Sequence, residues 1–321
     1  MKAIKILAAT AALAAGVSAY AQDAFPSRPI TIVVPYPAGG TSDNQVRMFK
    51  DELAKLLGQP VVVDNKPGAS GAIAAQFVAR APADGHTLLY PNNGVVIAPL
   101  LNEKAGYDSL KDFKPIATVT AVPMVLVTNK GVPGTSLGEF LTQARRAPQG
   151  LQYASAGTAS YGHLATARLG SMTGLKLEHI PYRGEAATTL AVRTGEVQML
   201  LTTPSSAMLG QVREGHLNLL GVASAAPSPV VPGVPTINSV VPDFTAEVWF
   251  GLLAPAGTPD AVIEKINAGL RQVMASEDLA KRLMPTGALP RVSSPAEFGA
   301  IMKREHAEWR EVIAKHGIKA D

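Results

Sequence analysis

The segment Ile30-Thr31-Ile32-Val33-Val34 is followed by Pro35-Tyr36-Pro37-Ala38-Gly39-Gly40-Thr41-Ser42-Asp43, and this junction decides the fold. Its first part is a short β-branched apolar run, which is typical of a strand buried on both faces of a sheet. Its second part is a loop, beyond which apolar residues recur at helical spacing from Val46 to Leu57. Gly58 predicts the C-terminal cap of that helix. The segment therefore predicts one strand–loop–helix unit of an α/β protein.

The same alternation continues along the chain. Further strands are predicted at 61–63, 87–90, 122–127, 152–154, 177–182, 197–201 and 217–222. Helices are predicted after the turn at 65–71, at 136–147 and 165–172, and in the C-terminal part, where Thr258 is the expected N-cap with Pro259 as the first helical residue. A Pro-rich stretch at 227–242 indicates a rigid surface connection. Alternating strands and helices predict parallel sheets with right-handed crossovers.

Length and composition narrow the class of protein. The chain has 321 residues, of which 47% are hydrophobic. This length exceeds the usual size of a domain with a single core, so two domains are predicted. It contains no Cys, which excludes disulfides, thiolate metal sites and a cysteine nucleophile. Its net charge is only +4 and no run of five basic residues occurs, so no nucleic-acid partner is expected.

The N-terminus has the pattern of a secretory signal peptide. Lys2 and Lys5 precede an apolar stretch at 6–17, and Ala19-Tyr20-Ala21 is a small-x-small cleavage site. The stretch is shorter than the roughly 20 apolar residues that span a bilayer. Residues 1–21 are therefore predicted to be a signal peptide cleaved after Ala21, and the mature chain is expected to be a soluble protein of a bacterial periplasm.

Three predicted strand-to-helix junctions, at 35–43, 90–94 and 154–160, combine small residues with helix N-termini. Such junctions offer free N–H groups and the positive end of a helix dipole, which favour an anion. In open α/β sheets, ligands lie outside the carboxyl ends of the strands, where all three loops are expected. Any one loop is equally well explained as an ordinary capped turn, but three together favour a site for a carboxylate or phosphate.

Individual side chains carry less information. Asp43 could accept a hydrogen bond from a ligand, but the residues alone favour a structural role, with Arg47 as its i, i+4 partner. Arg183 could clamp a carboxylate, although a solvated loop arginine is the better interpretation. Tyr36 could line the apolar side of a pocket or simply pack at the surface.

Signatures of enzymes and metal sites are missing from the sequence. A Gly-x-Ser-x-Gly elbow fails around Ser160 because Thr158 stands where the first glycine belongs. No P-loop, HExxH or EF-hand pattern occurs, and the six histidines lack metal-ligand spacing. We therefore predict no catalytic residue, no metal and no cofactor.

At these loops the sequence resembles a known family, the periplasmic solute receptors of tripartite tricarboxylate transporters, also called Bug receptors. The resemblance extends from Pro29 to about Gly317 and rests on an ordered set of motifs. They are Pro37-Ala38-Gly39-Gly40-x-x-Asp43-x-x-x-Arg47, Val63-Asp64-Asn65-Lys66-Pro67-Gly68-Ala69, Tyr153-Ala154-Ser155-Ala156-Gly157 with His163-Leu164, Pro181-Tyr182-Arg183-Gly184, and Trp249-Phe250-Gly251-Leu252 with Ala254-Pro255-Ala256-Gly257-Thr258-Pro259.

The resemblance implies a type II periplasmic binding protein, with two α/β lobes joined by two crossing strands. Lobe I is expected at 24–120 and 228–321, and lobe II at 121–227. The cleft is expected to bind a small organic carboxylate through residues of both lobes: Tyr36, Ala38, Gly39, Gly40, Asp43, Asn92, Asn93, Ser155, Ala156, Gly157, Thr158 and Arg183.

This chain departs from the family pattern at several of these places. Asn92 and Asn93 stand where small hydroxyl residues or glycines are common, and Arg183 replaces a lysine. In the helix that follows, Ala187 and Ala191 stand where Pro and Asp are usual. Without that acid the ammonium of an amino acid loses a partner, so a carboxylate lacking an amino group is expected.

The function implied is that of a monomeric receptor that delivers its carboxylate to membrane permease subunits. One alternative is a sensing subunit that presents the same ligand to a signalling partner such as a sensor kinase. The other is an exported hydrolase that uses Asp43 or His163, for which the sequence offers no nucleophile–base pair.

Overall fold

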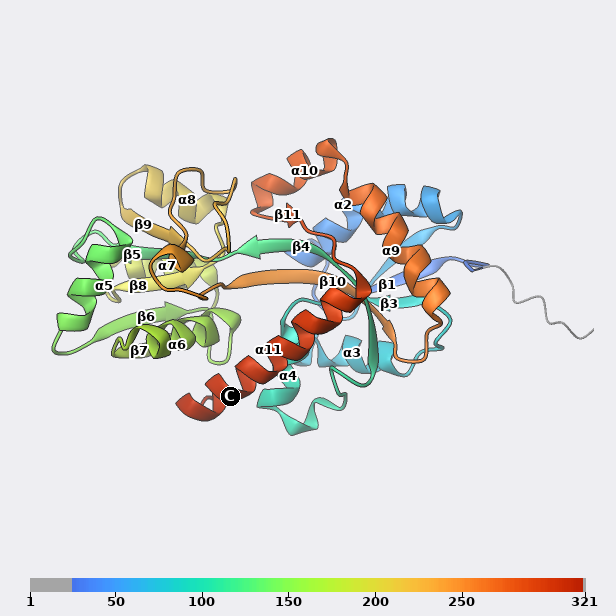
Figure 1. Cartoon of the computed structure of the whole chain (residues 1–321), viewed down its shortest axis with the longest axis horizontal. Coiled ribbons are helices and arrows are strands. Elements are labelled where there is room, and N and C mark those ends of the chain that lie inside the picture. The colour runs from blue at the N-terminus through green and yellow to red at the C-terminus, as the bar shows by residue number, and fades with distance from the viewer. Residues whose placement is uncertain (1–24, 320–321) are drawn as a thin grey trace, which may run out of the picture.

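The computed structural model describes residues 25–319, which form two α/β lobes (Figure 1). The first lobe is built on a six-stranded sheet of order β11-β4-β10-β3-β1-β2. The second is built on a five-stranded sheet of order β7-β6-β8-β5-β9. Over the described range, no helix has the length and apolar character needed to cross a membrane. The predicted signal peptide lies outside the described residues.

The first lobe begins with the strand–loop–helix unit expected from the sequence. Its elements are β1 (Ile30–Val34), α2 (Thr41–Leu57), β2 (Val61–Asn65), η1 (Ala69–Gly71), α3 (Ala72–Ala79), β3 (Thr87–Leu89), α4 (Gly94–Leu101) and η2 (Glu103–Ala105). Strand β1 runs parallel to both β2 and β3, which confirms the predicted parallel pairing of these three strands, but β10, β4 and β11 join the sheet antiparallel, so the sheet is mixed. Because parallel strands end at the same edge, the loops after β1 and β3 emerge side by side.

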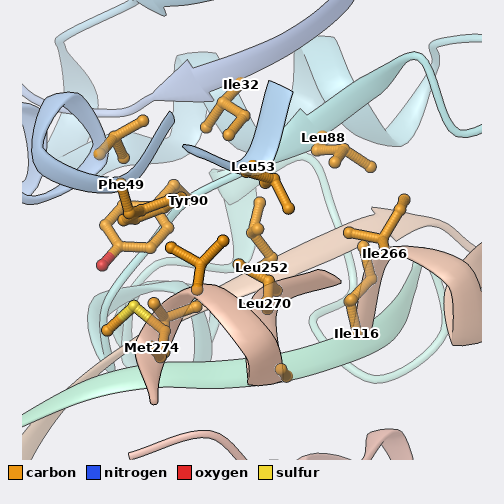
Figure 2. Packing of buried hydrophobic residues seen from close by; sticks show 14 of the residues in the cluster. Ile32, Phe49, Leu53, Leu88, Tyr90, Ile116, Leu252, Ile266, Leu270 and Met274 are labelled. Carbon is orange, nitrogen blue, oxygen red and sulfur yellow. The ribbon is translucent and has the colours of Figure 1, made fainter. Parts of the chain in front are cut away.

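Helix α2 and helix α9 (Asp260–Met274) pack over this sheet and enclose a dry core (Figure 2). Phe49 and Leu53 of α2 meet Ile266 and Leu270 of α9 there. Burying each such side chain contributes about 1.5–3 kcal/mol. Helix α2 ends at Gly58, whose φ of 79° is the left-handed conformation of a glycine cap, as predicted.

Two long antiparallel strands join the lobes, β4 (Phe113–Pro123) and β10 (Glu247–Pro255) (Figure 1). The single strand predicted at 122–127 is wrong, because the chain changes sheets at Met124 and continues as β5 (Val125–Asn129). The Met124 N–H donates to Ala246 O at 2.9 Å, and Met124 O accepts the Ala223 N–H at 2.8 Å. These bonds hold the crossing point of the hinge. The predicted lobe boundary at 120/121 falls within β4.

The second lobe has parallel strands at one side of its sheet and antiparallel strands at the other. Strand β6 (Leu151–Ser155) runs parallel to β7 (Leu177–Pro181) and β8 (Met199–Thr202), and β5 runs antiparallel to β8 and β9 (Leu217–Val222). Its helices are α5 (Leu137–Arg146), α6 (Tyr161–Thr173), α7 (Glu185–Thr194) and α8 (Ser206–Arg213), and the Pro-rich return holds only η3 (Ile237–Ser239). Because β6 and β7 are parallel, the loops that follow them emerge at the same edge of the sheet.

The C-terminal segment returns to the first lobe and then leaves it. It comprises α9, α10 (Glu277–Leu283), η4 (Met284–Thr286), β11 (Leu289–Pro290) and the long α11 (Pro295–His316). Phe298 and Met302 of α11 are buried in the first lobe, whereas Trp309 and Val312 are buried in the core of the second. Helix α11 is thus a third connection between the lobes (Figure 1).

The predicted N-cap of α9 is wrong by one residue. The helix begins at Asp260 with Pro259 in the cap position. The Thr258 hydroxyl instead donates to Pro255 O at 2.8 Å, which closes the turn at the end of β10.

Candidate functional site

A cavity of about 740 Å³ lies between the lobes, where the loops after β1, β3 and β6 converge. Its floor and one wall come from the first lobe, and residues 158–161 of the second lobe close the other side. The lining residues are Tyr36, Ala69, Ser70, Ala72, Asn92, Asn93, Gly94, Ile97, Ala98, Leu101, Asn102, Ala105, Thr158, Ala159, Ser160, Tyr161 and Val248. None of these lining residues has a charged side chain.

On the first-lobe side, the loops after β1 and β3 are joined through side chains. The Tyr36 hydroxyl donates to Asn92 Oδ1 at 2.6 Å, and the Gly94 N–H donates to the same oxygen at 2.9 Å. The Asn65 amide donates to Tyr36 O at 3.1 Å and fixes the backbone of the β1 loop. Burial raises the pKa of Tyr36 to about 12, so its hydroxyl keeps its proton at physiological pH.

Asn93 faces a buried carboxyl group beneath the cavity. Its Nδ2 donates to Glu305 Oε1 and Oε2 at 3.0 and 2.9 Å, and its Oδ1 accepts the Trp249 backbone N–H at 3.0 Å. The Trp249 indole also donates to Glu305 Oε1 at 3.0 Å. Because these donors are neutral, they offset the burial of a carboxylate only in part, and burial raises the pKa of Glu305 to about 7.

Asp43 holds the loop at 37–43 from inside the protein. Its Oδ2 accepts the Gly39 N–H at 2.8 Å and Arg47 Nε at 2.8 Å. The hydrogen bond from Arg47 lowers the pKa of Asp43 to about 2, although burial alone would raise it. The Asp43 side chain is 2% exposed and does not line the cavity. The predicted i, i+4 pair with Arg47 is therefore confirmed.

On the second-lobe side, the loop after β6 rests on two stacked imidazole rings. His163 and His179 lie 3.6 Å apart between ring centroids, at an interplanar angle of 14°. His163 Nδ1 accepts the Ala159 N–H at 3.0 Å, and His179 Nε2 lies 2.6 Å from Ser155 Oγ. Burial and the neighbouring His179 lower the pKa of His163 to about 4. Ser160 begins α6 by accepting the His163 N–H at 3.4 Å.

The cavity brings together four of the residues predicted for the site: Tyr36, Asn92, Asn93 and Thr158. The others do not line it; they are Ala38, Gly39, Gly40, Asp43, Ser155, Ala156, Gly157 and Arg183. Arg183 is exposed on the loop after β7, beside the Ser155 loop, because Tyr182 N donates to Ser155 O at 2.9 Å.

Sequence reasoning missed the apolar part of the lining. Ile97 and Leu101 lie on α4, a helix whose start was expected after the loop at 90–94 but whose extent was not predicted, because it is only eight residues long and contains Pro99. Ser70 lies in the turn before α3. The sequence indicated this turn, and the small residues around Ser70 could have indicated that it lines the site.

A second cavity, of about 870 Å³, lies against β4, β10 and α11. It contains none of the predicted site residues, and its lining carries charged side chains such as Arg168, Arg291 and Glu308. Tyr161 lines both cavities, and Glu305 reaches the second one from beneath Asn93. Among residues 25–319, no cluster of three His, Asp or Glu side chains could hold a metal ion.

The family model for the tripartite tricarboxylate transporter family receptor matches residues 45–318. The chain belongs to this family of periplasmic solute-binding receptors. It is similar to protein BugT of Bordetella pertussis, with 33% identity over 319 residues, 98% of this chain and 97% of that protein. The Bug receptor family expected from the sequence motifs is thereby confirmed.

Solved structures confirm the fold of periplasmic binding proteins. Rpa4515 of R. palustris with adipate is 32% identical, covers 92% of this chain and 99% of its own, and has a TM-score of 0.73. MatC of Rhodopseudomonas palustris with bound malate is 33% identical, with coverage of 90% and 100% and a TM-score of 0.69. A solute-binding protein from Polaromonas without ligand is 30% identical, with coverage of 91% and 99% and a TM-score of 0.81.

Proposed function

We propose that this receptor captures a small organic carboxylate without an amino group in the 740 Å³ cavity and delivers it to membrane permease subunits. The observation that carries the proposal is the lining of that cavity. Amide and hydroxyl groups lie at the converging strand ends, hydrocarbon side chains form one wall, and no lining side chain is charged. Adipate and malate, bound by the two relatives, are small carboxylates.

The chemistry of the lining suits a carboxylate. The N-termini of α4 and α6 border the cavity at Gly94 and Tyr161, and the positive ends of their dipoles favour an anion. A hydrogen bond to a charged group contributes about 1.5–3 kcal/mol, so three to five of them offset the cost of association. A micromolar dissociation constant corresponds to about −8 kcal/mol, which such a lining can supply.

The apolar wall and the missing acids define the rest of the ligand. Ile97, Leu101 and Val248 fit a hydrocarbon body rather than a second strongly hydrated group. An ammonium group would find no carboxylate among the lining residues. These features favour an aliphatic or aromatic acid over an amino acid.

An enzymatic role has little support, and we propose none. Ser155 and His179 form a close pair, but Ser155 is 1% exposed, and its hydroxyl is within 2.8 Å of Gly157 O. A nucleophile must reach its substrate, and this one is sealed inside the loop. Asp43 is bound to Arg47, and His163 Nδ1 is already occupied by the Ala159 N–H.

We also propose that ligand capture closes the lobes, with lobe I at 24–120 and 228–321 and lobe II at 121–227. The cavity lies between the lobes, and the two strands that join them, β4 and β10, allow a hinge motion there. Hinge closure would then bring the loops at 155–158 and 182–184 toward the cavity.

The receptors of this family are periplasmic, which agrees with the predicted export of this chain. We propose a monomer in the periplasm, exported by residues 1–21 with cleavage after Ala21. A sensor kinase in place of a permease would use the same binding step, and the cavity does not distinguish the two partners.

The experiment is thermal unfolding of refolded mature protein with acetate, succinate, malate, adipate, benzoate, aspartate and glutamate. A ligand at about 100 times its dissociation constant adds about 2.7 kcal/mol, which for a chain of this size is a few degrees. We expect selective stabilisation by one or more of the acids without an amino group. X-ray scattering with that acid should show a smaller radius of gyration. No stabilisation by any acid would overturn the proposal.

A further inference from the structure

We propose that Asn92 is the fixed hydrogen-bond donor that recognises the carboxylate, and that Tyr36 is the residue that positions it. The inference rests on the proposed function, because it concerns how the same cavity selects its ligand. Its basis is the orientation of one neutral amide, which the surrounding donors determine completely.

The orientation of the Asn92 amide follows from the Gly94 N–H. A backbone N–H can only donate, so the Asn92 atom 2.9 Å from Gly94 N must be the oxygen. The Tyr36 hydroxyl lies 2.6 Å from the same oxygen and must donate as well. Both lone pairs of Oδ1 are therefore occupied, and the NH2 group is held in the amide plane, pointing away from these two donors.

The NH2 group of Asn92 is available to a ligand. It makes no hydrogen bond to any of residues 25–319. It is also not a buried atom, so a ligand can reach it. Because Asn92 lines the cavity, this accessible group presents two N–H donors there. A carboxylate offers the acceptors that these donors need.

Asn92 also takes over the donor role of the helix behind it. Its Oδ1 accepts the Gly94 N–H and its backbone O accepts the Val95 N–H at 3.0 Å, so these N–H groups at the start of α4 are occupied. Gly94 itself is required for the close approach, because a Cβ there would lie 2.9 Å from Asn92 Oδ1 and 3.4 Å from the Tyr36 hydroxyl oxygen. The donor that an anion meets at this end of α4 is therefore the Asn92 amide.

Asn92→Asp tests the inference with almost no change in shape. Its Oδ1 keeps both hydrogen bonds, and an acceptor replaces the NH2 group. We expect affinity for the acid that binds wild type best among acetate, succinate, malate, adipate and benzoate to fall by about 30-fold or more, since a charge-assisted bond is lost and a repulsion is added. Tyr36→Phe, which only loosens the amide, should weaken the same acid by roughly 3- to 10-fold.

Asn102→Asp is the matched control. Asn102 borders the same cavity but is exposed at the C-terminal end of α4, the end opposite Asn92, where its Oδ1 accepts the Lys104 N–H at 2.9 Å. The control adds the same charge, and we expect a loss of about threefold or less. Titration calorimetry of the three variants and wild type gives the comparison, and thermal unfolding without ligand reports on the fold.

Each outcome has one meaning. If wild type binds none of the five acids, the proposed function fails and this inference fails with it. If wild type binds and Asn92→Asp or Tyr36→Phe binds as tightly, or Asn102→Asp is as weak as Asn92→Asp, only the inference is overturned. If Asn92→Asp does not fold, the side-chain amide resonances of Asn92 in wild type decide, since they must shift on saturation with the acid.

Discussion

Replacing Glu305 by Gln isolates the cost of a buried carboxylate at the junction of the lobes. Glu305 is 6% exposed, and the partners of its carboxyl group are the neutral donors of Asn93 and Trp249. Burial raises its pKa from 4.5 to about 7. The native state therefore holds a proton that the unfolded state releases between about pH 4.5 and pH 7.

The sign and size of the effect follow from proton linkage. A carboxyl group with a raised pKa in the folded state stabilises the fold at low pH, and this stability is lost as the pH rises through about 7. Each unit of pKa difference corresponds to about 1.36 kcal/mol, so the group contributes on the order of 2.5 kcal/mol more at pH 5 than at pH 8. Gln cannot titrate and lacks this dependence.

The assay is urea unfolding of wild type and Glu305→Gln at pH 5 and pH 8. Other titrating groups cancel in the difference between the two proteins, as does the pH-independent cost of placing an amide there. We expect the stability of the variant relative to wild type to improve by about 2–3 kcal/mol from pH 5 to pH 8.

Glu308→Gln is the control for this comparison. Glu308 lies on the same helix, with a side chain that is 34% exposed and 3.9 Å from Arg304. A pair of this kind is worth about 0–1 kcal/mol, so this variant should differ from wild type by nearly the same amount at both pH values. If Glu305→Gln behaved in the same way, the reasoning about Glu305 would be refuted.

Two further perturbations test the loops on either side of the cavity. Asp43→Ala removes the carboxylate that accepts hydrogen bonds from Gly39 and Arg47. We expect the free energy of unfolding to fall by only about 1–2 kcal/mol and carboxylate binding to become clearly weaker. Unchanged affinity in titration calorimetry would show that Asp43 has no role in binding. His163→Asn keeps an acceptor for Ala159 but does not titrate. Because the pKa of His163 is lowered in the folded protein, wild type loses stability as the pH falls from about 6.5 to about 4. The free energy of unfolding of the variant should therefore improve relative to wild type by about 2 kcal/mol between pH 7 and pH 4.5. Identical acid unfolding curves for the two proteins would count against this.

Local patterns predicted the parts of the fold that are local in sequence. The run Ile30–Val34, the apolar spacing of α2 and the cap at Gly58 are each determined by adjacent residues. The parallel pairing of β1 with β2 and β3 followed from the alternation of strands and helices. These features needed no knowledge of distant contacts.

The hinge could not be predicted from local patterns. Strand β4 carries Lys114, Pro115 and two threonines, so it has neither an apolar run nor a clear alternation. Its partner β10 lies more than a hundred residues later in the chain, and their pairing stabilises both strands. The two crossing strands were expected only from the resemblance to the receptor family.

The sequence predicted which loops form the candidate site, but not the contacts between their side chains. Tyr36 and Asn92 were both expected near a ligand, but the bond between them joins positions 56 residues apart. The orientation of the Asn92 amide depends on the Gly94 N–H, and therefore on the short helix α4, whose extent was not predicted. Roles that depend on which way a side chain turns require the assembled sheet edge.

The path of α11 limits how the receptor can move. Two adjacent strands alone would let one lobe both bend toward the other and rotate about the strand direction. Helix α11 is anchored by Phe298 in one lobe and by Trp309 in the other, and Trp309 also contacts Tyr161 edge to face at 5.3 Å. The helix is a third connection and lies outside the plane of the two strands. It therefore opposes the rotation but still allows the lobes to bend toward each other. We therefore expect the lobes to move relative to each other by bending, which would give them one defined relative orientation in the closed state proposed above.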